Sequence, residues 1–384
     1  NIVPDEAAIV KVASKVSSPS VNFLAAVPDS FEDLVPVNDT LAQALRLPLM
    51  ANDPVTSLQR LDKYKMQEAL REHGIYGARQ VRACSTSSAL ASLGDAQLTF
   101  PIIVKPLLSS ASDGVFLCRS EDELERAIQA NLGATSVFHH AKEEVVLQEY
   151  LQGVEFVVNT VSLHGHHRVL DMWQAHKVVD GTQILYGHQN LIADSHEHAD
   201  VVDFALQVLD AVGITGGAAH LEVVRTPHGV RLIEVNARPA GHTPRATRQR
   251  GEDQVSALAG ALARPESFLE RATRSPHYAL EGDDPELVMV VFLRAPRDAE
   301  LHRTDLMRLM QLPTFRRFDR VGVAMFAAAV EEAERESFWV ASKTDNLFTV
   351  PLTLLLVGRR ADLEADLDRV RELEKTMYNS YGTF

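Results

Sequence analysis

The sequence predicts an α/β protein of two or three domains. At 384 residues it is longer than one hydrophobic core usually organises. Segments with helical spacing alternate with short apolar runs that are typical of strands. The stretch His220–Arg238, HLEVVRTPHGVRLIEVNAR, contains two strand-like runs, His220–Arg225 and Val230–Arg238, around a Pro/Gly turn. We therefore interpret it as a β-hairpin.

The register of this hairpin decides which side chains meet. If Arg225 pairs with Arg231 across the turn, Glu222 lies directly opposite Glu234. Side chains alternate between the two faces of a strand, so Asn236 and Arg238 would share the face of the two acids. The other face would be apolar and suited to a core, with Leu221, Val223, Ile233, Val235 and Ala237.

Two directly opposed carboxylates repel each other, and a hard cation would remove that penalty. Glu222, Glu234 and the amide oxygen of Asn236 form a donor set that suits Mg²⁺. Arg238 adds a planar, permanent cation at the place where a transferring phosphate would lie. The alternative is a solvent-facing hairpin with hydrated acids.

The composition is that of an ordinary globular protein, with 46% hydrophobic and 23% charged residues. No apolar run approaches the length of a membrane span. The net charge of −14 argues against nucleic acid as a partner, although a local cationic cluster could still bind a nucleotide. The two cysteines, Cys84 and Cys118, lack metal-binding spacing and predict reduced thiols in a cytoplasmic protein.

The chain begins at Asn1 without a Met or a secretory pattern. We expect it to be part of a longer polypeptide, and a targeting segment upstream is left open. Pro4-Asp5-Glu6 followed by Ala7–Val16 predicts a helix start, and Leu41–Leu47 predicts a second helix. Asn52-Asp53-Pro54 predicts a loop.

Two lysines lie within predicted elements. Lys63 lies in the first turn of a predicted helix, Leu61–His73, and Lys105 lies in a buried strand, Phe100–Pro106. Burying an unpaired charge is costly, so we expect Lys105 to face a ligand phosphate. The loop Leu107–Val115 is rich in Ser and Gly, whose backbone N–H groups can cradle a phosphate and close over it. An ordinary surface turn is the alternative.

The rest of the chain predicts further helices and strands. The predicted helices are Glu121–Asn131, Asp200–Val212, Gln254–Ala263 and Asp362–Met377. The predicted strands are Val145–Tyr150, Phe156–Leu163, His167–Trp173, Leu287–Arg294, Val321–Val330 and Leu352–Gly358. Six histidines lack a clean ligand spacing, so we assign them to the surface or to a substrate pocket: His164, His166, His167, His188, His196 and His198.

In this order, the motifs resemble the ATP-grasp superfamily. Glu222 followed by Glu234-x-Asn236-x-Arg238 resembles its metal-binding hairpin. Upstream stand Asp62-Lys63, Ile102–Pro106, the Ser/Gly loop and Glu149-Tyr150-Leu151-x-Gly153-x-Glu155. The resemblance covers about residues 61 to 249. It implies a three-part ATP-grasp fold, with an incomplete N-terminal α/β domain (1–60), a small central ATP-binding domain (61–146) and a large C-terminal domain (147–384) with an extension from about residue 280.

The resemblance also implies roles for individual residues. Contacts with ATP would come from Lys63, Lys105, Ser109, Ser110, Ser112, Gly114, Val115, Glu149, Tyr150, Leu151, Glu155 and Lys177. Mg²⁺, or Mn²⁺ in its place, would be held by Glu222, Glu234 and Asn236. Arg238 and Lys105 would be catalytic, and the substrate pocket would include His220, Arg238, Gly241 and His242.

Within the superfamily the chain looks most like the L-amino-acid ligases, which often serve peptide-antibiotic pathways. This implies that a carboxylate attacks the γ-phosphate of ATP to give an acyl phosphate and ADP. The amine of a second amino acid then displaces phosphate and leaves a dipeptide. Three alternatives stay open: a ligase that joins another carboxylic acid to an amino acid or amine, a biotin-dependent carboxylase subunit, and a non-catalytic nucleotide-binding protein. The expected partners are small amino-acid substrates, with no nucleic acid or membrane, and a homodimer is left open.

Overall fold

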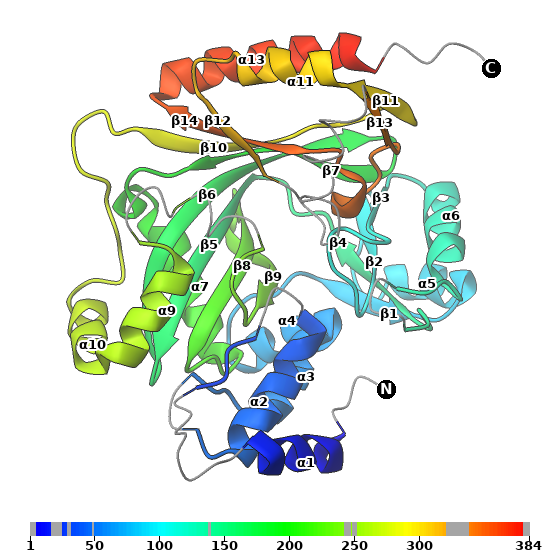
Figure 1. Ribbon diagram of the computed structural model, residues 1–384. Helices are drawn as coiled ribbons and strands as arrows, with labels where there is room; N and C mark the ends of the chain where they lie inside the picture. The colour runs from blue at the N-terminus through cyan, green and yellow to red at the C-terminus, as the bar shows by residue number, and fades with distance from the viewer. Residues whose placement is uncertain are drawn as a thin grey trace. The chain divides into compact units, whose positions relative to one another are not determined.

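The computed structural model describes residues 5–16, 25–28, 32–47, 50–136, 140–241, 247, 252–319 and 338–378 (Figure 1). The chain forms two compact units. The first comprises Asn1–Met172 and Asp194–Ala279, and the second comprises Trp173–Ala193 and Leu280–Phe384. The domain boundaries expected near residues 60 and 146 stay predictions.

The first unit begins with helices. They are α1 (Glu6–Val16), the 3-10 helix η1 (Glu32–Leu34), α2 (Val35–Ala44), α3 (Pro54–Leu61) and α4 (Lys63–Glu72). The loop predicted at Asn52-Asp53-Pro54 is wrong at its end, because Pro54 is the first residue of α3. Asp53 caps this helix by accepting hydrogen bonds from the N–H groups of Val55 and Thr56, and Pro is favoured at the first position because it needs no donor there.

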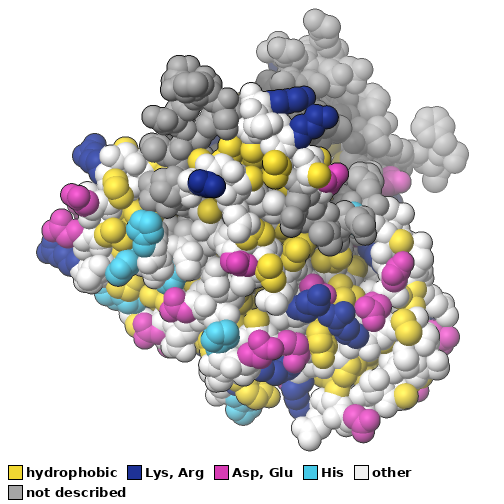
Figure 2. All heavy atoms as spheres, turned by 90° about the horizontal axis from the view of Figure 1, so that it is seen from below, with side chains coloured by type: hydrophobic (Ala, Val, Ile, Leu, Met, Phe, Trp, Pro, Cys, Tyr) yellow, Lys and Arg dark blue, Asp and Glu magenta, His cyan; other side chains and the backbone are white. Residues whose placement is uncertain are grey.

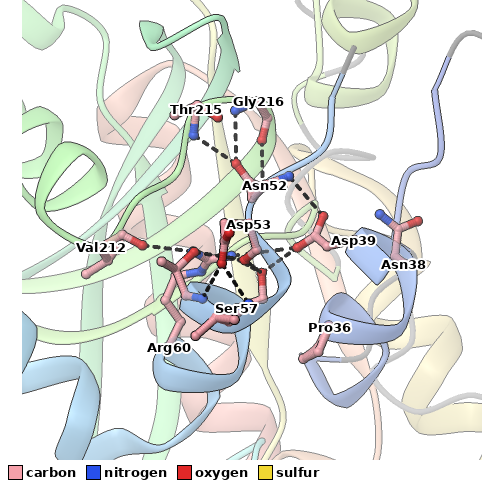
Figure 3. A network of polar contacts seen from close by, with 12 residues as sticks. Pro36, Asn38, Asp39, Asn52, Asp53, Ser57, Arg60, Val212, Thr215 and Gly216 are labelled. Carbon is pink, nitrogen blue, oxygen red and sulfur yellow. Dashed lines mark hydrogen bonds and ion pairs between the residues drawn. The ribbon is translucent and has the colours of Figure 1, made fainter. Parts of the chain in front are cut away.

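Hydrogen bonds of Asn52 connect the N-terminal helices to the turn that precedes β8 (Gly217–Thr226) (Figure 3). Its Oδ1 accepts from the N–H groups of Thr215 at 2.8 Å and Gly216 at 3.1 Å, and its Nδ2 donates to the Gly216 carbonyl at 3.1 Å. The N–H of Asn52 donates to Asp39 Oδ1 at 3.1 Å, which adds α2 to the same network.

A buried ion pair completes this anchor. Arg60 lies 3.7 Å from Asp39, and it donates to the carbonyl oxygen of Val212 at 2.8 Å (Figure 3). Burial lowers the pKa of Arg60 to about 10 and raises the pKa of Asp39. Because breaking a buried pair leaves an uncompensated charge, α2 and α3 are firmly tied to the end of α7 (Ala199–Ala211) and the start of β8.

The next part of the first unit is a small antiparallel sheet in the order β1-β4-β2-β3. Its strands are β1 (Gln80–Ala83), β2 (Ile102–Pro106), β3 (Phe116–Cys118) and β4 (Val145–Glu149). The helices α5 (Thr86–Leu93) and α6 (Glu121–Asn131) pack on one face of it through a shared apolar core (Figure 1). Cys118 lies in this core, where burial raises its thiol pKa to about 12. Both cysteines are free, so no disulfide joins them.

The larger strands of the first unit run in the order β6-β5-β8-β9. They are β5 (Val154–Leu163), β6 (His166–Asp180), β8 and β9 (Gly229–Asn236). The helices α9 (Gln254–Ala263) and α10 (Pro265–Arg274) bury small and aromatic side chains against β5 and β8. The short helix η2 (Ser195–His198) leads into α7.

The second unit is an antiparallel sheet. The later half of β6 pairs with β7 (Gln183–Leu191), which pairs with β10 (Leu287–Phe292), then β14 (Thr353–Gly358) and β12 (Phe315–Asp319). Helices α11 (Arg303–Met310) and α13 (Arg360–Met377) cover one face of it (Figure 1). The strands β11 (Ala299–His302) and β13 (Phe338–Ala341) form a separate pair, and η4 spans Leu347–Thr349. The strand predicted at Val321–Val330 lies outside the described residues.

In the part of the chain that the structure describes, no helix is both long and apolar enough to cross a membrane. On the face drawn in Figure 2, Lys and Arg side chains lie interspersed with Asp and Glu side chains.

Candidate active site

The β8–β9 hairpin places two carboxylates directly opposite each other. Glu222 pairs with Glu234, as predicted, and His220 pairs with Asn236. The pairing of Arg225 with Arg231, from which that register was inferred, is wrong: Arg225 pairs with Val230. Near the turn, therefore, the strands are offset by one residue from the expected register.

A β-bulge reconciles these observations. The register shifts between Glu222 and Val223, and Val223 pairs with Leu232, which leaves Ile233 as the extra residue. The turn is one residue tighter than expected, and the bulge restores the register at the acids. As a result Leu232 is fully buried, whereas Ile233, which was predicted to face the core, is only partly buried. The other predicted core residues of the hairpin are buried as expected.

Lys63 brings three segments together at this acid pair. Its Nζ lies 2.8 Å from Glu234 Oε1 and 2.5 Å from the carbonyl oxygen of Ser109, and its backbone N–H donates to the Leu107 carbonyl at 3.1 Å. The side chains of Lys63 and Glu234 are 8% and 21% exposed, so the contact is shielded from solvent. The first residue of α4, the start of the Ser/Gly loop and the acidic hairpin therefore meet at one ammonium group.

His220 lies at the edge of the acid pair. Its Nδ1 is 2.8 Å from Asn159 Oδ1, and Asn159 Nδ2 donates to the buried Asp171 Oδ1 at 2.5 Å. Because the amide nitrogen of Asn159 donates to a carboxylate, its oxygen accepts, so Nδ1 of His220 carries the hydrogen. The other ring nitrogen, Nε2, lies 3.7 Å from Glu222 Oε1.

Arg238 follows Asn236 beyond the end of β9 and is only 9% exposed. Its Nη2 is paired with Glu32 Oε1 from η1, and its Nη1 donates to the Pro239 carbonyl at 2.9 Å. Its Nε is buried and has no hydrogen-bond acceptor among the described residues. A buried donor without a partner marks a position where a ligand oxygen would be bound favourably.

The Ser/Gly loop is anchored at its far end as well. Ser109 Oγ donates to Asp113 Oδ2 at 3.0 Å, and Asp113 is paired at 3.0 Å with the buried ammonium of Lys142. Gly114 has a φ of +72°, and a Cβ there would lie 2.2 Å from Asn131 Oδ1. The loop therefore requires Gly at this position.

The remaining positions of the loop are Ser110, Ser112 and Val115. The carbonyl of Ser110 accepts from the N–H of Asp113 at 3.0 Å, and that of Ser112 accepts from the N–H of Val115 at 3.2 Å. Ser112 has a φ of 63°, a left-handed conformation that costs a residue with a side chain free energy. The tip of the loop is thus strained while its two ends are held.

The strands β2 and β4 carry the predicted adenine side of the site. Lys105 is buried in β2, and its Nζ donates to Gln148 Oε1 at 2.9 Å. The carboxylate of Glu149 accepts from the backbone N–H of Arg79 at 2.8 Å and from its Nε at 2.9 Å. Glu149 thus ties β4 to the start of β1, and any contact that it makes with adenine would come from its backbone.

The segment that connects β4 to β5 packs closely against the backbone of β8. Tyr150 and Leu151 are partly buried, and Glu155 lies on β5 opposite Val224. At Gly153, a Cβ would lie 2.1 Å from the carbonyl oxygen of Arg225, so the backbones approach too closely for any other residue.

Three other predicted site residues stay predictions. Lys177 belongs to the second unit, where its Nζ lies 5.1 Å from the ring centroid of Tyr186, and its contact with a phosphate stays a prediction. Gly241 is exposed, and His242 lies outside the described residues.

The donor set of the hairpin fits a hard divalent cation. Among the described residues, no three His, Cys, Asp or Glu side chains form a metal-binding group by themselves. The set consists instead of two opposed carboxylates, Glu222 and Glu234, and the amide of Asn236 two residues further along β9. Mg²⁺ is usually bound by one or two carboxylates together with substrate phosphates and water, so this small oxygen set suits it.

Sequence reasoning missed several residues that complete the cluster. Glu32, Asn159, Gln148 and Lys142 each contact a predicted residue or its loop, and none lies in a recognisable motif. Glu32 and Arg238 are 206 residues apart in the chain, so no local pattern could have joined them.

The chain resembles known proteins in both sequence and fold. Residues 98–245 match the sequence model of the ATP-grasp domain. This segment is therefore similar to ATP-grasp domains, in agreement with the resemblance that the order of the motifs predicts.

Among individual proteins, the chain is 33% identical over 251 residues to dapdiamide A synthase from Enterobacter agglomerans, which covers 65% of this chain and 59% of that protein. It is 27% identical over 238 residues to a D-alanine–D-alanine ligase from Pseudomonas entomophila, over 58% of this chain and 70% of that protein. The fold matches the crystal structure of an L-amino acid ligase from Bacillus licheniformis with a TM-score of 0.70 and 20% identity, over 99% of this chain and 86% of that chain. The chain thus spans about three fifths of the length of dapdiamide A synthase.

Proposed function

We propose that the chain is an ATP-dependent ligase that joins the carboxylate of one amino acid to the amine of another. The products would be a dipeptide, ADP and phosphate. The observation that carries the proposal is the opposed pair Glu222 and Glu234, with the Lys63 ammonium on one of the two acids. The similarity to a D-alanine–D-alanine ligase and to an L-amino acid ligase fold supports the same reaction class.

Glu222, Glu234 and Asn236 would hold Mg²⁺, which, when bound, offsets the charge of the ATP phosphates. Lys63 and Lys105 would supply fixed positive charge to the same phosphates from shielded positions. The first residue of the loop Leu107–Val115 accepts a hydrogen bond from the backbone of Lys63, so the loop would cover the phosphates and keep water from the acyl phosphate.

Arg238 would act at the second step. When an amine adds to the acyl phosphate, the carbonyl oxygen becomes an oxyanion that needs a donor. The buried Nε–H of Arg238 would serve as that donor. The oxyanion would then re-form the carbonyl double bond as the bond between the carbon and the phosphate oxygen breaks and phosphate leaves.

The test is to incubate the full chain with ATP, Mg²⁺ and a mixture of L-amino acids, and to measure ADP, phosphate and product masses. We expect products with the masses of dipeptides, in a molar amount equal to that of ADP. The matched control is Glu234→Gln prepared in the same way, which should form neither product. ADP formation without any new amide bond would contradict the proposal.

A further inference from the structure

Among the described residues, the guanidinium of Arg238 contacts two hydrogen-bond acceptors. Of its five N–H groups, one on Nη2 is directed at Glu32 and one on Nη1 at the Pro239 carbonyl. The Pro239 contact is to the next residue in the chain, so it turns with the backbone of Arg238 itself. Glu32 is therefore the contact that fixes the guanidinium relative to the rest of the first unit.

Glu32 is shielded from solvent and directly precedes an anchored helix. The side chains of Glu32 and Arg238 are 8% and 10% exposed, so the pair is desolvated. The 3-10 helix η1 runs directly into α2, and Asp39 of α2 accepts from the N–H of Asn52, whose side chain binds Thr215 and Gly216 before β8. The helix that follows Glu32 is thus hydrogen-bonded, through Asn52, to the turn before β8; Figure 3 shows the contacts of Asp39 and Asn52.

We propose that Glu32 is a positioning residue, which orients the Arg238 guanidinium so that its Nε–H points at the reacting carbonyl. The proposal rests on the proposed function. Nε and Nη2 share one edge of the guanidinium, and the contact of Glu32 with Nη2 leaves the Nε–H without an acceptor. A carboxylate that accepted hydrogen bonds from both nitrogens would have left no Nε–H available for a substrate.

Glu32 would act by restricting the rotamers of the Arg238 side chain and not through its charge. An arginine side chain has a large rotamer entropy, and a donor aimed at the transition state is effective only if that freedom is already lost. A carboxylate beside the guanidinium also weakens its positive field, so Glu32 would hinder catalysis if charge alone mattered. Its benefit must therefore come from the hydrogen bond that holds Arg238 in place.

The experiment compares Glu32→Met, which keeps the volume but removes the acceptor, with Glu32→Gln, which keeps an acceptor oxygen but removes the charge. We expect kcat of Glu32→Met to fall at least about tenfold, with the KM for ATP changed less than about twofold. Glu32→Gln should retain roughly a third or more of kcat, because its amide oxygen still accepts from Nη2. In an Arg238→Lys background, Glu32→Met should lower kcat by less than about twofold, because the two residues act as one unit.

The control variant is Asp200→Asn, which removes one carboxylate from an exposed pair with Arg225 in the same unit and should leave kcat unchanged. Equal kcat for Glu32→Met and wild type would overturn the proposal, and so would an undiminished effect of Glu32→Met in the Arg238→Lys background.

A second readout does not depend on activity. In protein with ¹⁵N-labelled arginine, the Nε–H signal that disappears in Arg238→Lys should keep its position in Glu32→Gln and move or broaden in Glu32→Met. If Glu32→Met does not fold, a displaced signal in Glu32→Gln with unchanged kcat would refute the positioning role. If wild type forms no ADP with any amino acid, the proposed function fails, and this signal still reports whether Glu32 holds Arg238.

Discussion

Replacing Lys63 by Met should strengthen the binding of a divalent cation when no nucleotide is present. The ammonium of Lys63 occupies the carboxylate of Glu234 that the cation would use. In the free protein Lys63 therefore acts as a substitute cation for the opposed acids, and a metal ion has to compete with it.

The structure sets the size of this effect. Two unit charges separated by 2.8 Å attract by about 6 kcal/mol at an effective dielectric constant of about 20. Desolvation cancels much of that attraction, and a hydrogen bond to a charged group leaves a net contribution of about 1.5–3 kcal/mol. Since 1.4 kcal/mol corresponds to a factor of ten, Lys63→Met should bind the cation at least roughly tenfold more tightly.

The assay is a titration of nucleotide-free protein with Mn²⁺, in which the free ion is measured by electron paramagnetic resonance. The matched control is Lys142→Met. Lys142 is also a shielded lysine, 3.0 Å from a carboxylate of Asp113, but it touches none of the proposed metal ligands. Its replacement should leave the Mn²⁺ affinity unchanged. ATP binding should change in the opposite direction and become weaker in Lys63→Met. An Mn²⁺ affinity of Lys63→Met no higher than that of wild type would refute this reasoning.

Three further predictions follow from the same structure. Glu234→Gln should abolish turnover. It should keep a cooperative thermal transition, because the amide oxygen of Gln can still accept a hydrogen bond from Lys63. Near-wild-type ATP consumption by this variant at saturating Mg²⁺ would show that Glu234 is not a metal ligand. Residues Ser109–Val115 should exchange amide hydrogens quickly without nucleotide and slowly with it, and equal exchange in the two states would argue against a phosphate cover. Burial, with the nearby charges of His176, Arg371 and Arg294, lowers the pKa of His188 in the folded protein to about 4. In the unfolded chain the same imidazole has its ordinary pKa of about 6.5. The neutral ring therefore stabilises the fold above about pH 6.5, and this stability is lost as the pH falls towards about 4, so His188→Gln should lose less thermal stability than wild type between about pH 7 and about pH 5.

Local sequence signals predicted much of the fold because their causes are local. The helices α6 and α9 have the predicted bounds, and each begins after a capping side chain, Ser120 and Asp253 respectively. The loop expected at Asn52-Asp53-Pro54 shows how such a signal can be misinterpreted, because an Asp-Pro pair favours both a turn and a helix start.

The candidate site was predicted in part. The opposition of Glu222 and Glu234 is correct, but it depends on a bulge at Ile233 that compensates for a tighter turn, and no residue type in the hairpin specified that bulge. The contacts of Lys63 with Glu234 and of Arg238 with Glu32 join residues 171 and 206 positions apart. Such contacts arise from packing of whole elements, and a single sequence carries no pattern for them.

The central claim is that a substrate carboxylate attacks the γ-phosphate of ATP. The most direct measurement uses amino acids with ¹⁸O in both carboxylate oxygens and follows the label by mass spectrometry. If the acyl phosphate forms, one ¹⁸O passes to inorganic phosphate for each amide bond made, and ADP is the nucleotide product. Label recovered in AMP, or phosphate that carries no ¹⁸O while amide bonds accumulate, would contradict the account.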